Sequence, residues 1–262
     1  MKTIALYIMT GAMALLMNAC LQVESTISLK KDGSGTITEN LILGQQMVQM
    51  MEMAAAQAGP DADPMAQMVD KAKAAARAKG MGEGVELVSV EKINANGKIG
   101  VKTVFKFADI NKLKYTTSSA MGDMEGMDVK EDENAAPEFK YADGKLTIIQ
   151  KQPKGDAEAA EDKEDAMGDE MEEQAMAMMQ QMMKDMRMTM KLKLEPGIKK
   201  TNATHVEGDT VTMADIQFDK LLSNPEKLKA LQSGDFEKTK KALEGMEGVK
   251  FEAQEKVEIE LK

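Results

Sequence analysis

The chain has no tryptophan, one cysteine and one histidine, and aromatic residues make up only 3% of its 262 positions. A single cysteine excludes an internal disulfide, so stability has to come from packing. The scarcity of aromatic side chains argues against carbohydrate binding, which relies on aromatic platforms. We therefore expect a core that is aliphatic and rich in methionine, of which the chain has 26.

Recognisable catalytic patterns are also missing. The single histidine, His205, lies beside an expected turn and is most simply a loop or strand residue that faces solvent. A zinc centre or a Ser-His-Asp arrangement would have to use this one residue. The glycines of residues 80–84 lie between an expected helix and an expected strand, which is not the context of a phosphate-binding loop. We expect no enzymatic activity and no cofactor.

The charge balance favours neither nucleic acid nor an anionic membrane as a partner. Lys and Arg total 34 against 44 Asp and Glu, for a net charge of −10. An acidic protein is repelled by phosphate-rich surfaces. Any hold on a membrane must therefore come from something other than charge.

The N-terminal segment supplies such a hold. An apolar stretch from Ile4 to Met17 is followed by Ala19 and Cys20. Its length of about 14 residues is short for a membrane span but typical of a signal peptide. The pattern predicts a lipoprotein signal peptide over residues 1–19, with Cys20 as the lipidated first residue of the mature protein. Ordinary secretion and an uncleaved anchor are the alternatives.

A lipid such as palmitate on Cys20 would make the protein a membrane-anchored component of the cell envelope. The following residue is Leu21, not the Asp that signals retention at the inner membrane. In a cell with two membranes, we expect attachment to the outer membrane, facing the periplasm.

Alternating apolar residues predict β-hairpins. Later segments predict a strand over residues 188–194, a strand pair around the turn at 207–209, and one long final strand over 249–261, broken only at Glu255. The three hairpins span residues 23–43, turning at Asp32–Gly35; 85–107, turning at Asn94–Gly97; and 139–149, turning at Asp143-Gly144.

Apolar residues at spacings of three and four predict helices. These include a methionine-rich pair at 45–58 and 64–79, a helix with Met171, Ala175, Met178, Met182 and Met186 on one face, and two short helices at 219–231 and 235–245. Residues 116–136 and the acidic segment 153–170 are expected to be surface loops, the second of them mobile. The fold class is α+β in a domain over 20–262, with an antiparallel or mixed sheet built from hairpins and paired methionine-rich helices packed on it.

Two segments have a second interpretation as metal sites. Met178, Met179, Met182 and Met183 offer soft thioethers that would suit Cu(I), although their spacing equally predicts a buried helix face. The acidic run Asp156–Glu173 lacks the ligand spacing of a calcium loop and is best interpreted as a solvated linker.

Two segments resemble LppM-type bacterial lipoproteins. One is the opening from Cys20 through Asp32-Gly33-Ser34-Gly35, which resembles the first strand, Asp-Gly turn and second strand of that family. The other runs from Leu194-Glu195-Pro196-Gly197 through Asn202 to Met213, which stands where the family usually has an aromatic residue. The resemblance implies a lipid-anchored α+β domain associated with lipid or glycolipid at the envelope, and it supplies no catalytic residues.

These observations lead to three expectations about function. The first is a lipid-anchored envelope protein without catalysis that binds an apolar or lipid ligand. The second is a structural or assembly lipoprotein that binds other envelope proteins through a sheet edge or the acidic loop. The third is binding of periplasmic Cu(I) by the methionine-rich helix.

Overall fold

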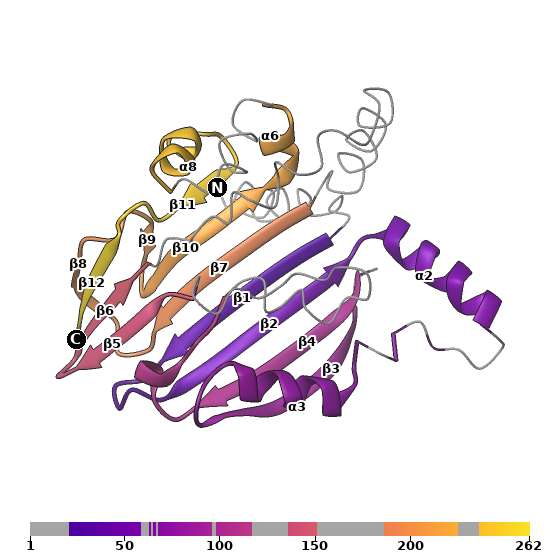
Figure 1. Ribbon diagram of the computed structural model, residues 1–262, viewed down its shortest axis with the longest axis horizontal. Coiled ribbons are helices and arrows are strands. Elements are labelled where there is room, and N and C mark those ends of the chain that lie inside the picture. The colour runs from indigo at the N-terminus through magenta and orange to yellow at the C-terminus, as the bar shows by residue number, and fades with distance from the viewer. Residues whose placement is uncertain are drawn as a thin grey trace, which may run out of the picture.

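The structure is a computed structural model that describes residues 21–58, 63, 65–66, 68–95, 98–116, 136–150, 186–224 and 236–262. Its main element is a large mixed sheet (Figure 1). The strand order is β11-β10-β7-β1-β2-β4-β3, and β9 pairs with β10. The strands are β1 (Leu21–Leu29), β2 (Gly35–Leu43), β3 (Val85–Ala95), β4 (Lys98–Phe107), β7 (Met186–Leu194), β9 (Val206–Glu207), β10 (Thr210–Gln217) and β11 (Val249–Phe251).

A smaller antiparallel sheet has the order β5-β6-β12-β8. Its strands are β5 (Glu138–Ala142), β6 (Lys145–Ile149), β8 (Ile198–Thr201) and β12 (Lys256–Leu261). Within the large sheet the hairpins are antiparallel, whereas β1 and β7 pair in parallel from Leu21↔Met186 to Leu29↔Leu194. The α+β fold with a mixed sheet and the three hairpins are confirmed.

One face of the large sheet is buried. In both β1 and β2 every second residue is buried and the residues between them are half-buried. This alternation follows from the strand period of two, which sends successive side chains to opposite faces. The buried face therefore carries the core, and the opposite face carries polar residues such as Glu24, Asn40 and Lys102.

Two apolar clusters lie along the buried face. The distal cluster joins the two sheets, because Ile27, Leu29 and Phe107 of the large sheet share it with Leu146 and Ile259 of the small one. The second, called the methionine cluster here, lies at the end of the sheet where β1 begins. Its buried members are Leu21, Val23, Leu41, Leu43, Met65, Ala74, Val90, Val101 and Met186, with Met47, Val48, Met51, Met68 and Met188 among the half-buried residues packed against it.

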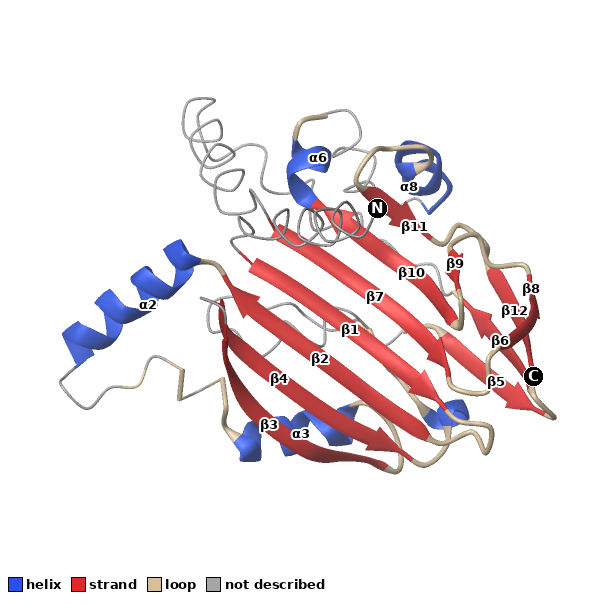
Figure 2. Ribbon diagram, turned by 180° about the vertical axis from the view of Figure 1, so that it is seen from behind, coloured by secondary structure: helices blue, strands red, loops and turns tan. Residues whose placement is uncertain are grey.

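The helices are short and lie around the sheet. They are α2 (Gln45–Ala58), α3 (Lys71–Gly80), the 3-10 helix η2 (Ile110–Lys112), α6 (Phe218–Leu222) and α8 (Phe236–Leu243). Figures 1 and 2 show α3 beside β3, whereas α2 projects from the end of the sheet. The buried side chains of α3 are Ala74 and Ala78.

The expected helix over 64–79 begins later than its pattern predicts. Asp70 is the N-cap, and its carboxylate accepts hydrogen bonds from the backbone N–H groups of Ala72 and Lys73. Met65 and Met68 lie before this cap in turns, yet Met65 is buried and Met68 packs against the methionine cluster. Their spacing arises because both side chains pack toward the methionine cluster from turns, and not because they lie on one face of a helix.

The prediction of a single final strand over residues 249–261 is also wrong. Residues 249–251 form β11 in the large sheet, and residues 256–261 form β12 in the small sheet. Between them Glu252 is fully buried and its carboxylate accepts three hydrogen bonds, from the Thr204 N–H, the Thr204 hydroxyl and the Gln254 N–H. These bonds hold the chain where it crosses from one sheet to the other.

Candidate functional site

The end of the large sheet where β1 begins is the candidate functional region. Cys20 lies outside the described residues, but Leu21, which follows it, is the first residue of β1 and only 2% exposed. Leu21 pairs with Leu43 on one side and with Met186 on the other. The chain therefore has no spacer between Cys20 and a central strand of the sheet.

Methionine side chains from three separate segments gather at this end. Met47 and Met51 come from α2, Met65 and Met68 from the turns before α3, and Met186 and Met188 from β7. Thioether side chains are flexible and polarizable, so such a cluster can repack around an apolar group. Four of these residues belong to the methionine-rich pair expected at 45–58 and 64–79, whereas the other methionine-rich helix lies, before Met186, outside the described residues.

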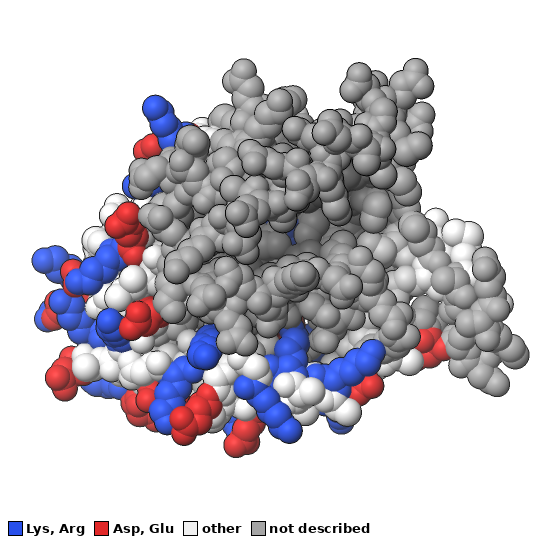
Figure 3. All heavy atoms as spheres, viewed as in Figure 1, with Lys and Arg blue, Asp and Glu red and all other residues white. Residues whose placement is uncertain are grey.

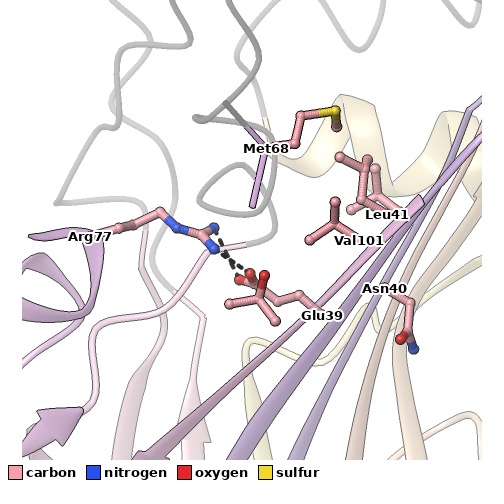
Figure 4. Close-up of a pocket in the computed structure, with 8 residues that line it drawn as sticks. Glu39, Asn40, Leu41, Met68, Arg77 and Val101 are labelled. Atoms are coloured by element: carbon pink, nitrogen blue, oxygen red, sulfur yellow. Dashed lines mark hydrogen bonds and ion pairs between the residues drawn. The ribbon is translucent and has the colours of Figure 1, made fainter. Parts of the chain in front are cut away.

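A small cavity lies beside the methionine cluster (Figure 4). Its volume is about 20 Å³, which is room for about one water molecule. Figure 4 shows Met68, Leu41 and Val101 on its apolar side, and Arg77 reaching from α3 toward Glu39 of β2 on the other. A cavity of this size does not enclose an acyl chain.

The polar wall of this cavity is a buried ion pair. Arg77 Nη2 donates to Glu39 Oε2 at 2.6 Å, and Nη1 donates to Oε1 at 3.3 Å. The side chains are only 12% and 5% exposed, so water screens the pair weakly. The guanidinium carbon of Arg77 also lies 5.1 Å from the centroid of the Phe105 ring, a cation–π geometry. The pair fastens α3 to the middle of the sheet.

Tyr115 completes the network. Its hydroxyl is within hydrogen-bond distance of Ser25 Oγ, at 2.6 Å, and of Glu39 Oε1, at 2.9 Å. Burial and the charge of Glu39 raise the pKa of this hydroxyl well above its ordinary value. Tyr115 therefore stays protonated and donates to the carboxylate. The arrangement is that of a buried structural network.

Sequence reasoning missed this network, although a signal for it exists. The alternation of the second strand places Ile37 and Leu41 on the buried face, and Glu39 stands between them in the same phase. A charged residue at a buried strand position requires a partner. The partners Arg77 and Tyr115 are 38 and 76 residues away in sequence, and only the fold brings them there.

The opposite, polar face of the sheet has an open hollow of about 400 Å³ near the same end. It is lined by Gln22, Asn40 and Ile42, and by Arg187 and Lys191 among others. The cations have partners: Arg187 donates twice to the Asp215 carboxylate, each at 2.8 Å, and Lys191 pairs with Glu24 at 2.7 Å. Burial opposes ionisation of Asp215, but the hydrogen bonds and charge of Arg187, the Thr189 hydrogen bond and the charge of Lys250 together outweigh it and keep the pKa of this carboxyl below its ordinary value.

The surface charges in view are mixed in sign. Figure 3 shows acidic and basic side chains interspersed on the described part of the side seen in Figure 1, where α3 lies in front of the sheet. Exposed ion pairs of the described residues include Lys106–Glu86 at 2.9 Å and Lys112–Glu83 at 2.8 Å. Such pairs contribute little to stability.

Most of the candidate metal-binding residues lie outside the described part of the chain. Met178, Met179, Met182 and Met183 lie outside the described residues, as does the acidic segment 153–170, so both interpretations stay predictions. Met186, assigned by its spacing to the same helix, is instead the first residue of β7. The cause is its alternation with Met188 and Met190, which share the buried face of a strand. His205 is half-buried in a loop, where its carbonyl accepts from the Thr212 N–H.

Within the described ranges, no group of three or more His, Cys, Asp or Glu residues is placed to hold a metal ion. None of the helices in these ranges is long and apolar enough to cross a membrane.

Comparisons with known proteins add a distant likeness of fold. No protein-family model matches the chain, and no curated protein matches it. Among solved structures, the chain is similar to the folded domain of LppM from Mycobacterium tuberculosis, determined by NMR. The TM-score is 0.35 and the sequence identity 11%, over 77% of this chain and 84% of that one. A likeness of this size is a distant structural relationship and decides neither family nor function.

Proposed function

We propose that the protein is a lipid-anchored envelope protein whose Cys20 carries the lipid, and whose α+β domain has a binding role and no catalytic one. The observation that carries the proposal is the direct continuation of Cys20 into β1 through the buried Leu21. A lipid at this position would hold the methionine-rich end of the sheet at the membrane. In a cell with two membranes, the site of attachment proposed is the outer membrane, facing the periplasm.

The anchor is tested by the variant Cys20→Ser. The wild-type protein is expected in the membrane fraction, with a mature N-terminal peptide whose mass includes a diacylglyceryl group. The variant is expected to lose both that mass and the membrane fractionation, with an unchanged circular dichroism spectrum, because Cys20 precedes the folded sheet. A wild-type N-terminal peptide without lipid contradicts the proposal.

The ligand proposed for the domain is an apolar or lipid group bound at the methionine cluster. The 20 Å³ cavity is too small for such a group, so binding requires the methionine side chains to repack. A fluorescent fatty acyl probe titrated into the Cys20→Ser protein tests this. Saturable binding that weakens in Met68→Glu, but not in Val206→Glu at an exposed distal position, supports it. Linear, non-saturating uptake of the probe contradicts it.

Assembly with other envelope proteins is the second candidate, because β3 forms one edge of the large sheet. An edge strand can accept another strand by main-chain hydrogen bonding. A register shift between Leu87 and Ser89 interrupts β3, and its exposed positions include Glu86, Glu91 and Lys92. Bulges and charges of this kind block strand addition, so the apolar ligand is the better-supported proposal.

A further inference from the structure

Helix α2 leaves the large sheet at the end where the chain enters from Cys20. Leu43, the last residue of β2, pairs with Leu21, the first residue of β1, and Gly44 alone separates Leu43 from α2. Figures 1 and 2 show α2 extending away from this end of the sheet, with the smaller sheet at the opposite end. The helix and the start of β1 therefore share one end of the molecule.

The composition of α2 is unusual for a helix that extends into water. Its 14 residues comprise four Met, four Ala, one Val, four Gln and a single charge, Glu52. Water-facing helices normally carry several charged residues on the exposed side. The first turns are explained by packing, because Met47, Val48 and Met51 contact the methionine cluster.

The rest of the helix has no such explanation. Met53 is 61% exposed, more than the other large exposed hydrophobic residues of the described ranges, Val88 at 55% and Val206 at 41%. No other described element makes extensive contact with α2. Met53 therefore exposes an apolar side chain on a helix with a single charge, at the end of the sheet where β1 begins.

Geometry selects the lipid bilayer as that partner. One Cα step of about 3.8 Å joins Cys20 to Leu21, and the paired Leu21 and Leu43 are about 5 Å apart. The first turn of α2 thus lies within roughly 15 Å of Cys20, less than half the thickness of a bilayer. A lipid on Cys20 would fix this end at the headgroup level and hold α2 at a high effective concentration beside the membrane.

We propose that α2 is a membrane-interface helix, which lies at the headgroup level of the bilayer that holds the lipid of Cys20, with the exposed Met53 side chain at the acyl boundary. The inference rests on the proposed lipid anchor. The helix has no Lys or Arg, so it would bind through apolar contact and tethering, not through attraction to anionic lipids. Methionine suits this role because its flexible side chain adapts to a disordered surface.

The experiment uses the lipidated full protein reconstituted in vesicles of neutral phosphatidylcholine. The lipidated sulfur of Cys20 is a thioether, so a cysteine introduced by Met53→Cys is the one free thiol for an environment-sensitive dye. Val88→Cys and Val206→Cys are matched controls, because both replace exposed apolar residues and lie toward the other end of the sheet. Lipids that carry a quencher near the headgroup report contact.

We expect at least a threefold stronger quenching at position 53 than at 88 or 206, with a blue-shifted emission. Equal quenching at the three positions overturns the inference. So does shielding of position 53 that depends on protein density and not on the lipid quencher, because that result assigns the helix to a second copy of the chain.

Failure of the anchor is measured separately, from the mass of the N-terminal peptide of the same preparation. If Cys20 carries no lipid, the proposed function fails whatever the dye reports. If Cys20 is lipidated and position 53 is not quenched above the controls, the interface helix alone is wrong.

Discussion

Glu39 and Arg77 form a buried ion pair, so removal of either charge should destabilise the fold. The variant Glu39→Gln removes the carboxylate that pairs with the guanidinium of Arg77, whose side chain is only 12% exposed. Removing one partner of a buried pair typically costs about 3–5 kcal/mol. We expect the free energy of unfolding of the Cys20→Ser protein, measured by urea denaturation, to fall by that amount.

The matched control is Glu86→Gln, which breaks the exposed Lys106–Glu86 pair on the same sheet. Its side chains are 58% and 65% exposed, so the expected change is below about 1 kcal/mol. Similar losses in the two variants would show that burial does not set the strength of the Glu39–Arg77 interaction.

Tyr115 should make the free energy of unfolding depend on pH in the alkaline range. Its pKa is raised in the folded state, so the folded protein holds the phenolic proton more tightly than the unfolded chain does. This contribution is complete below the ordinary tyrosine pKa of about 10 and is lost as the pH rises above it. We expect the free energy of unfolding to fall above this pH more steeply, by up to about 1.4 kcal/mol per pH unit, than in Tyr115→Phe.

The difference in slope between these two proteins is the measurement, because all other titratable groups are common to both. Absolute stability is not the readout, since Tyr115→Phe also removes the hydrogen bonds to Ser25 and Glu39. Parallel curves above pH 10 would mean that Tyr115 titrates equally in the folded and unfolded states.

Gly100 limits how two central strands can pair. A Cβ atom at this position would lie 2.1 Å from the Leu41 carbonyl oxygen of β2, so Gly100→Ala forces β2 and β4 apart. Overpacking of this kind costs typically 1–3 kcal/mol, which we expect as a loss in urea denaturation. Gly80→Ala is the control, because a Cβ atom at position 80 would meet no neighbouring element within 4 Å, and we expect no loss.

The elements that sequence predicted well are those with a local cause. The hairpins at Asp32–Gly35 and Asp143-Gly144 follow from turn residues between alternating strands, and both are present. The long strand over 249–261 failed because periodicity does not show that Glu252 is buried and bonded to Thr204, 48 residues away. Where the chain leaves a sheet is decided by tertiary hydrogen bonds of this kind.

At the scale of the molecule, local sequence patterns do not predict how the strands are arranged in the sheets. The parallel pairing of β1 with β7 joins residues that are 165 positions apart, such as Leu21 and Met186. Sequence predicts Cys20 as the position of a lipid anchor, but only this topology shows that β1 is a central strand and that α2 starts beside it. The candidate region therefore depends on the sheet as much as on the cysteine.

The proposed lipid on Cys20, directly before β1, leads to a last prediction. Ten Gly and Ser residues inserted between Cys20 and Leu21 form a flexible linker with a mean span of roughly 18 Å. Lipidation and membrane fractionation should be unchanged, because the linker leaves Cys20 and the signal peptide intact. Quenching of the dye at Met53→Cys should fall by at least half, because α2 is no longer held at the interface. The same linker inserted at Gly144, in the turn of the smaller sheet, should leave the quenching unchanged. Undiminished quenching with the linker after Cys20 would mean that α2 binds the bilayer by its own affinity, and that the direct continuation of Cys20 into β1 does not set the orientation of the domain.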